Sequence, residues 1–233
     1  MDKYNKILIK VSGEALSKGK GFGYDYDFVN TVCKQLIEVQ KMGKKVSLVV
    51  GGGNFWRGKS GGEMDRTIAD QMGMLATIMN ALCLQDTITK LGAKAVTLSS
   101  IEVNKVCEFF TKSKAEKYLD EGYIVIFAGG TGSPFFSTDT AASLRAAEIG
   151  ADLILLAKNV DGIYTSDPKL DKNAKKYDKI SYMEFIQKGL KAMDTTAVTM
   201  CMENNIPVLC FLLDETSIVR AVCGEKMGTL ITK

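Results

Sequence analysis

The sequence predicts an α/β protein built as a three-layer sandwich, in which helices cover both faces of a mostly parallel, twisted central sheet. Short β-branched apolar runs alternate with longer amphipathic segments along the 233 residues, which is the pattern of parallel strands joined by crossover helices. Three of these runs end in glycine-rich or Ser-Gly turns, as strands do at the ligand-binding edge of such a sheet. The length suits one large domain, which we take as residues 1–233.

Composition favours an ordinary globular protein and removes several kinds of chemistry. The net charge is +3 without a basic block, so we expect no nucleic-acid partner. No apolar run approaches the roughly 18 residues of a membrane helix, and no signal peptide is recognisable, so we expect a cytoplasmic protein without a membrane partner. The chain has no histidine, which excludes the commonest general base and histidine-ligated metals. Its six cysteines lack zinc-like spacing and are expected to be buried, reduced thiols.

The first predicted strand, residues 7–11, contains a lysine and runs into Ser12-Gly13. A buried ammonium group needs an anion to offset its desolvation. Lys10 is therefore predicted to contact a phosphoryl group, with the Ser-Gly amides forming part of an anion-binding nest. The alternative is a lysine on an edge strand that reaches water. A glycine loop at 19–24 then leads into an amphipathic helix at 27–42.

The second strand, residues 46–50, ends in Gly51-Gly52-Gly53. Glycines at this point can take φ > 0 or let a ligand approach the backbone, and Arg57 could offer a planar fork to phosphate oxygens. A glycine turn without a ligand is the alternative. Residues 53–60 also match the phosphate-loop pattern G-x-x-x-x-G-K-S. Two further glycines follow directly and disfavour the helix that this pattern needs, so a phosphate-loop NTPase is a lesser alternative.

A long helix is predicted at 65–91, followed by a strand at 95–98, a weaker helix to 121 and a strand at 123–128. Asp70 lies within the long helix. The apolar face of this helix is expected to be core rather than a cofactor site, and it consists of Met72, Leu75, Met79, Leu82 and Ile88.

The strand that ends at residue 128 opens onto a second glycine-rich turn and an alanine-rich helix at 140–149. Hydroxyl groups of this turn lie beside a helix N-terminus, which attracts anions. Asp139 could cap the helix or face a bound cation. A capped loop without a ligand is the alternative.

The rest of the chain alternates strands and helices. Tyr164 lies between two turn signals and could stack on a base or simply cover the turn. The charged segment 169–179 is expected to be a surface loop. The other predicted elements are a strand at 152–157, helices at 181–190 and 194–204, a strand at 208–213, a helix at 215–223 and a strand at 229–232.

Several motifs occur in a characteristic order along the chain. They are Lys10-Val11-Ser12-Gly13-Glu14-Ala15-Leu16, Gly51-Gly52-Gly53-Asn54-Phe55-Trp56-Arg57-Gly58, Asp70-Gln71-Met72-Gly73-Met74-Leu75-Ala76-Thr77, Gly130-Thr131-Gly132-Ser133-Pro134-Phe135-Phe136-Ser137-Thr138-Asp139, Val160-Asp161-Gly162-Ile163-Tyr164 and Ala192-Met193-Asp194. With them the chain resembles the bacterial uridylate (UMP) kinases of the amino-acid-kinase superfamily over nearly its whole length.

The resemblance implies the amino-acid-kinase fold and transfer of the γ-phosphoryl group of ATP to UMP, with Mg²⁺ carried by ATP and no direct protein ligand to the metal. It also implies a cytoplasmic homohexamer, with GTP as an activator and UTP as an inhibitor. By motif position, the residues on ATP would be Lys10, Val11, Ser12, Gly13, Gly53, Arg57, Lys158, Asn159, Tyr164 and Asp167. Those on UMP would be Gly52, Asp70, Thr131, Gly132, Ser133, Pro134, Phe135, Phe136, Ser137 and Thr138. GTP would bind at Lys18, Gly19, Lys20, Gly21, Phe22 and Gly23.

Phosphoryl transfer needs positioning and charge neutralisation more than a strong base, so the lack of histidine fits this activity. The catalytic residues are expected to be Lys10 and Arg57, which spread the transition-state charge, with Asp139 and Asp194 orienting the lysine or the cation. Two positions depart from the family pattern. Ser133 stands where relatives carry Asn, and Leu156 stands where some relatives carry Lys. There are two alternatives. One is a sibling kinase that acts on a carboxylate or carbamate, and the other is a nucleotide-sensing regulator without turnover.

Overall fold

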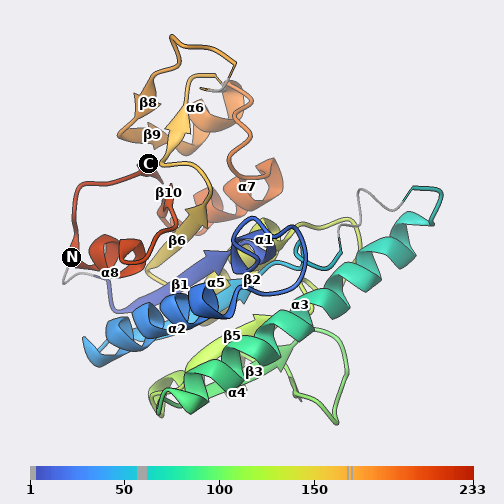
Figure 1. Cartoon of the computed structure of the whole chain (residues 1–233). Helices are drawn as coiled ribbons and strands as arrows, with labels where there is room; N and C mark the ends of the chain where they lie inside the picture. Colours follow the sequence, from blue (N-terminus) through green and yellow to red (C-terminus); the bar gives the residue numbers. More distant parts are fainter. Residues whose placement is uncertain (1–3, 57–61, 167, 169) are drawn as a thin grey trace.

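The computed structural model describes residues 4–56, 62–166, 168 and 170–233. Its main feature is a nine-stranded sheet with the order β4-β3-β5-β2-β1-β6-β10-β11-β9 (Figure 1). Neighbouring strands are parallel except for β10 and β11, so the prediction of a mostly parallel α/β sheet is confirmed. The strands are β1 (Lys6–Val11), β2 (Lys45–Val50), β3 (Ala95–Ser99), β4 (Glu108–Phe109), β5 (Ile124–Ala128), β6 (Leu153–Lys158), β9 (Lys179–Ser181), β10 (Val208–Leu212) and β11 (Thr229–Thr232).

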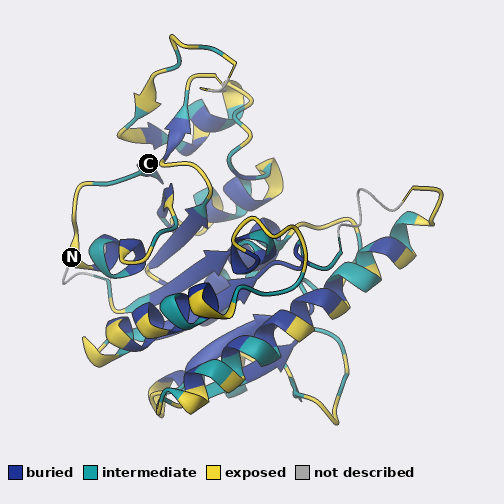
Figure 2. Cartoon of the chain, in the orientation of Figure 1, coloured by how far each residue is buried: buried dark blue, intermediate teal, exposed yellow. Residues whose placement is uncertain are grey.

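Helices cover both faces of the sheet, because the strands are apolar on both sides. Alternate residues of β1 divide between two cores: Ile7 and Ile9 pack with α2, α3 and α8, whereas Leu8 packs with α4, α5, α6 and α7. Figure 2 shows the buried sheet between partly exposed helices. The helices are α1 (Gly13–Leu16), α2 (Tyr26–Lys41), α3 (Arg66–Lys90), α4 (Lys112–Asp120), α5 (Thr138–Ile149), α6 (Tyr182–Gln187), α7 (Thr195–Glu203) and α8 (Ser217–Cys223).

The helix α3 has the predicted length, but its buried face differs from the predicted one. Asp65 caps its start, accepting hydrogen bonds from the Thr67 and Ile68 amides. Leu75 and Met79, expected in the core, are 50% and 49% exposed. The face that packs on the sheet is shifted by about one position, and its buried apolar residues are Ala69, Met74, Ala76, Ile78, Ala81, Leu84 and Ile88.

By length and composition alone, α3 could cross a membrane, which was not expected from the sequence. In this structure 44% of its most apolar window is buried inside the protein. Figure 1 shows α3 lying beside α2 across one face of the sheet. Core helices of globular proteins share this composition.

The prediction of a surface loop at 169–179 is wrong in its second half. Strand β8 (Lys176–Tyr177) pairs with β7 (Ile163–Tyr164) as a short antiparallel ribbon, and β9 then joins the main sheet parallel to β11. Strands β8 and β9 each contain one lysine and one apolar residue, and Ile180 is buried. Strands of two and three residues are too short to show a period of two within a charged segment.

The carboxyl ends of β5, β2, β1 and β6 meet at one edge of the sheet, since these strands are successive neighbours. The Gly51 amide donates to the Val11 carbonyl over 3.0 Å, which joins the turns after β2 and β1. This convergence of glycine-containing turns is the predicted one.

Candidate active site

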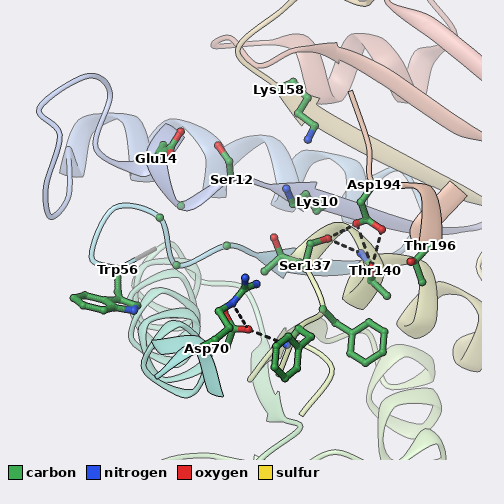
Figure 3. A pocket seen from close by; sticks show the side chains of 18 residues that line it. Lys10, Ser12, Glu14, Trp56, Asp70, Ser137, Thr140, Lys158, Asp194 and Thr196 are labelled. Carbon is green, nitrogen blue, oxygen red and sulfur yellow. Dashed lines mark hydrogen bonds and ion pairs between the residues drawn. The ribbon is translucent and has the colours of Figure 1, made fainter. Parts of the chain in front are cut away.

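A cavity of about 590 Å³ lies at this edge of the sheet. It is formed by the ends of β1, β2 and β6 and by the starts of α1, α3, α5 and α7. Figure 3 shows Lys10, Ser12 and Lys158 on one side of the space, with Trp56 and Asp70 on the other. We refer to it as the larger cavity.

Two lysines that line the larger cavity, from neighbouring strands, share one buried carboxylate, that of Asp139. Lys10 Nζ lies 2.6 Å from Asp139 Oδ1, and Lys158 Nζ lies 3.1 Å from Asp139 Oδ2. Lys10 is on the central strand β1 and is only 5% exposed, so the alternative of an edge-strand lysine reaching water is wrong. Asp139 lies in the first turn of α5.

The electrostatics of this group favour an anion nearby. Burial lowers the pKa of Lys10, against the opposing attraction of Asp139. Burial alone would raise the pKa of Asp139, but the ammonium groups of Lys10 and Lys158 outweigh it and lower that pKa below its ordinary value. The two lysines and Asp139 together carry a net charge of +1. The same cavity is also lined by Arg66 and by the carboxylates of Glu14, Asp70 and Asp194.

The glycines after β1 and β2 are required by close backbone packing. A Cβ on Gly13 would lie 2.6 Å from the Gly51 carbonyl oxygen and from the Gly53 nitrogen. A Cβ on Gly52 would lie 2.9 Å from the Gly73 carbonyl oxygen of α3. None of the three glycines at 51–53 has a positive φ. The turn is therefore glycine-rich because α1, α3 and the turn itself approach one another closely.

The start of α5 is tied to the start of α7. Ser137 caps α5 by accepting from the Asp139 and Thr140 amides at 3.0 and 3.2 Å, so Asp139 is not the cap. Ser137 and Thr140 both donate their hydroxyls to Asp194, which in turn caps α7 through the Ala197 amide at 2.9 Å. Among the contacts of the described residues, Asp194 accepts hydrogen bonds from two hydroxyls and one amide and does not contact a lysine.

A smaller cavity of about 130 Å³ adjoins the larger one. Five residues line both spaces: Gly52, Trp56, Asp70, Phe136 and Thr138. The remainder of the smaller cavity is lined by Gly73, Met74, Thr77, Gly130, Thr131 and Ser133.

The smaller cavity brings together some of the residues predicted to bind UMP. One of its walls is a single face of α3. Asp70, Gly73, Met74 and Thr77 follow the i, i+3, i+4, i+7 spacing of one helix face. That spacing is the signal that could have identified Met74 and Thr77, which were not predicted. Trp56 and Arg66, also not predicted, line the larger cavity.

Asp70 joins α3 to the turn after β5. It accepts a hydrogen bond from Arg66 Nε and another from the Phe135 amide, both at 2.8 Å. Its side chain is only 13% exposed. Figure 3 shows both contacts as dashed lines at the edge of the larger cavity.

Several predicted residues lie away from these two cavities. Tyr164 lines a third cavity of about 580 Å³ with Ile163, Leu170 and Leu190, and its hydroxyl donates to Asp161 over 2.7 Å. The predicted residues that line none of the three cavities are Val11, Gly132, Pro134, Asp139, Asn159 and the predicted GTP residues Lys18, Gly19, Lys20, Gly21, Phe22 and Gly23.

The predicted GTP loop is nevertheless joined to the turn after β2. The Gly23 amide donates to the Asn54 carbonyl at 3.1 Å, and Asn54 Nδ2 donates to the Gly23 carbonyl at 3.0 Å. Asn54 also pairs with Asn80 of α3, which donates to the Gly51 carbonyl over 2.6 Å. The predicted roles of Arg57 and Asp167 fall outside the described residues, as do Lys59 and Ser60 of the phosphate-loop pattern.

Comparisons with known proteins agree on one family. A profile of the amino acid kinase family matches residues 5–211. A UMP kinase structure from Bacillus anthracis has a TM-score of 0.94 and 39% identity, covering 98% of this chain and 96% of that one. A UMP kinase from Ureaplasma parvum has a TM-score of 0.93 and 38% identity, covering 99% and 100%. A uridylate kinase from Archaeoglobus fulgidus has a TM-score of 0.76 and 28% identity, covering 97% and 100%.

Proposed function

Because this chain belongs to the amino acid kinase family, we propose that it is a UMP kinase, which transfers the γ-phosphoryl group of ATP to UMP and yields UDP and ADP. The observation that carries this proposal is the end-to-end likeness to UMP kinase structures, at a TM-score of 0.94 and 39% identity. The paired cavities support it, since the transfer needs two nucleotides held with their phosphates adjacent. The reaction would serve pyrimidine nucleotide synthesis, including that of CTP.

UMP would occupy the smaller cavity, with its phosphate directed into the larger one. Asp70 is placed to accept hydrogen bonds from ribose hydroxyls, and the turn at 131–138 would surround the base and the phosphate. The phosphates of ATP would lie beside Lys10, Ser12, Gly13 and Gly53, which line the larger cavity. Of the two residues proposed after β6, Lys158 is the better candidate for an ATP contact, since Asn159 does not line the cavity.

The catalytic contribution of these residues would be positional and electrostatic. The phosphate of UMP is already an anionic nucleophile, so no residue has to remove a proton from it. Lys10 and Lys158 would stabilise the negative charge that develops on the transferred group. Asp139 would hold both ammonium groups in place, and Asp194 would position α5, the helix that carries Asp139.

Mg²⁺ would enter this site on the phosphates of ATP and neutralise part of their charge. Both oxygens of Asp139 already contact lysines. Among the residues that the structure describes, no group of three or more Asp, Glu, Cys or His side chains could form a metal cage. This donor set suits a metal held mainly by the nucleotide and water.

The nucleoside of ATP would lie against the third cavity, where Tyr164 and the apolar side chains of Ile163 and Leu190 offer a surface for a base. Asp167 keeps its proposed role on the same nucleoside. The Lys18–Gly23 segment keeps its proposed role as the GTP site, with the paired Asn54 and Asn80 amides as a physical connection to the active-site turn.

The chain would assemble as a homohexamer, and the exposed face of α3 supports self-association. Ile68, Leu75 and Met79 are 49%, 50% and 49% exposed, and with Met72 they follow a heptad-like spacing that suits packing against another helix. We also propose that residues 1–233 act as one domain, because strands from both ends of the chain share one sheet. A cytoplasmic location follows only from the proposed activity.

The test is ADP release with ATP and Mg²⁺, offering UMP, CMP, dUMP, glutamate and carbamate in turn. UMP-dependent turnover far above the others is the expected result. Turnover with glutamate or carbamate would indicate a sibling kinase. Binding of UMP without turnover on any compound would indicate a nucleotide-sensing regulator. The ratio of UMP to CMP turnover would also measure the effect of Ser133.

A further inference from the structure

Arg66 lies in the first turn of α3 and lines the larger cavity, yet none of the roles proposed above uses it. Its Nε donates to Asp70 Oδ2 over 2.8 Å. Its guanidinium carbon also lies 5.6 Å from the centroid of the Phe135 ring, within the range of a cation–π contact. Arg66 therefore connects the helix that carries Asp70 with the turn that carries Phe135.

Phe135 has a backbone conformation that needs support. Its φ is +71°, in the left-handed region that residues other than glycine seldom adopt. Its amide donates to Asp70 Oδ2 over 2.8 Å, so one oxygen accepts from both Arg66 and Phe135. The Phe135 side chain is 66% exposed, so core packing does not hold it. Contacts to Asp70 and Arg66 stabilise the turn at this residue.

We infer that Arg66 is a positioning residue for the nucleoside of the phosphoryl acceptor. It orients the Asp70 carboxylate and stabilises the left-handed turn at Phe135, which sets the nucleoside loop, residues 131–138, over the smaller cavity. This inference rests on the proposed function, because the nucleoside in question is that of UMP. The guanidinium itself lines the larger cavity, so Arg66 acts on the ribose and base side only through Asp70 and the turn at 131–138, which line the smaller cavity. The phosphate side is provided by Lys10 and Lys158.

This role makes a distinctive prediction about ligands with and without a phosphate. If Arg66 acts only through Asp70 and Phe135, its loss weakens the binding of uridine and of UMP by the same factor. If its guanidinium instead touches the phosphate, its loss weakens the binding of UMP and leaves the binding of uridine unchanged. The ratio of the two affinities separates the two roles.

The experiment compares wild type with Arg66→Gln by calorimetric titration of UMP and of uridine into the full chain. We expect both ligands to bind roughly tenfold more weakly, the size of one charge-assisted hydrogen bond. Arg66→Lys keeps the charge but lacks the planar fork and Nε–H, so it should restore only part of the affinity. Arg220→Gln is the matched control, since Arg220 is a surface arginine of α8 that pairs with Glu225.

Steady-state kinetics add a second readout. The KM for UMP should rise by a similar factor, while kcat and the KM for ATP stay within about twofold. The inference would be overturned if only the affinity for UMP fell, or if the binding of both ligands were unchanged. So would a fall in kcat with an unchanged KM for UMP. Wild-type protein that fails to bind UMP would overturn the proposed function and this inference with it.

Discussion

Lys10 is the residue on which the chemistry of this site depends most. A lysine on the central strand of a sheet is costly, because its ammonium group loses its hydration. Here the Asp139 carboxylate lies 2.6 Å from Nζ and offsets part of that cost. Lys158 contacts the other oxygen of the same carboxylate. The site therefore keeps two positive groups in a fixed geometry before any substrate arrives. Such preorganisation lowers the activation barrier of a reaction in which negative charge develops.

Replacing Lys10 with alanine should lower kcat by about 10²-fold or more, because one fixed positive group is lost from the transition state. The same change at Lys45, a surface lysine that pairs with Asp120, is the control and should leave kcat unchanged. The measurement is UMP-dependent ADP release at saturating substrate. Near-normal turnover in the Lys10→Ala variant would refute the assignment.

Sequence could predict Lys10 but not the partners that define its environment. A lysine inside an apolar run is visible in the printed sequence, and so is the Ser-Gly turn after it. Asp139 and Asp194 were predicted as acidic residues near the site, but their hydrogen bonds depend on where α5 and α7 begin. Arg66 belongs to none of the sequence motifs, and it reaches the cavity because α3 begins there. Trp56 lies within the motif at 51–58, but nothing in that motif indicated that its side chain lines the cavity.

At the scale of elements, Asp194 connects two helices that flank the active-site edge of the sheet. It caps α7 through the Ala197 amide, and it accepts from the hydroxyls of Ser137 and Thr140 on α5. A single carboxylate therefore fixes the first turns of both helices. Because Asp139 lies in that first turn of α5, the placement of the lysine pair depends on this connection.

Asp194→Ala should lower the free energy of unfolding by about 2–3 kcal/mol, the sum of a lost helix cap and lost charge-assisted hydrogen bonds. Asp194→Asn keeps an acceptor for the cap, so its loss should be smaller, at about 1 kcal/mol. Urea denaturation of both variants measures the difference. Equal stability of the alanine variant and wild type, combined with lost turnover, would instead place Asp194 on the substrate or cation.

The predictability of the elements follows their length and periodicity. The 25 residues of α3 show a clear helical pattern, and its ends were predicted within about one residue. The buried face of α3 was not predicted correctly, because apolar residues occur on both sides of the helix. One side packs on the sheet, and the other, with Leu75 and Met79, is exposed. Strands of two or three residues, such as β8 and β9, lack enough residues to show a period among lysines.

For the whole molecule, the exposed side of α3 is an apolar surface that a second copy of the chain could cover. Leu75→Arg should disrupt self-association, since a charge would be buried against an apolar helix. Met183 on α6 is similarly exposed, at 51%, so Met183→Arg serves as the control. Sedimentation velocity should show a smaller species for Leu75→Arg alone. An unchanged sedimentation coefficient for that variant would mean that α3 is not the interface.

The stability of the molecule should fall in alkaline solution, because its buried thiols resist ionisation. Burial raises the pKa of Cys33 and Cys210 to about 12 and that of Cys201 to about 11. The unfolded chain loses these protons near the ordinary thiol value of 9.0, so the native state holds more protons above that pH. Stability is therefore fully present below pH 9 and decreases from there towards the folded-state values.

Each of these thiols should contribute a decrease of about 1.4 kcal/mol per pH unit within that window. Urea denaturation in a reducing buffer at successive pH values measures the slope. Cys201→Ala is the matched variant, and its slope should be smaller than that of wild type whatever its absolute stability. Identical slopes for the two proteins would contradict this account.

Trp56 is the single tryptophan of the sequence, and it stands in the wall between the two adjoining cavities. Its indole N–H donates to the Ala69 carbonyl over 2.8 Å, which fixes the ring against α3. The consequence is optical. Under excitation that spares tyrosine, all the fluorescence of the protein arises from one chromophore at the boundary of the two sites. The order in which two nucleotides enter can then be followed in real time, without a label and without any substitution.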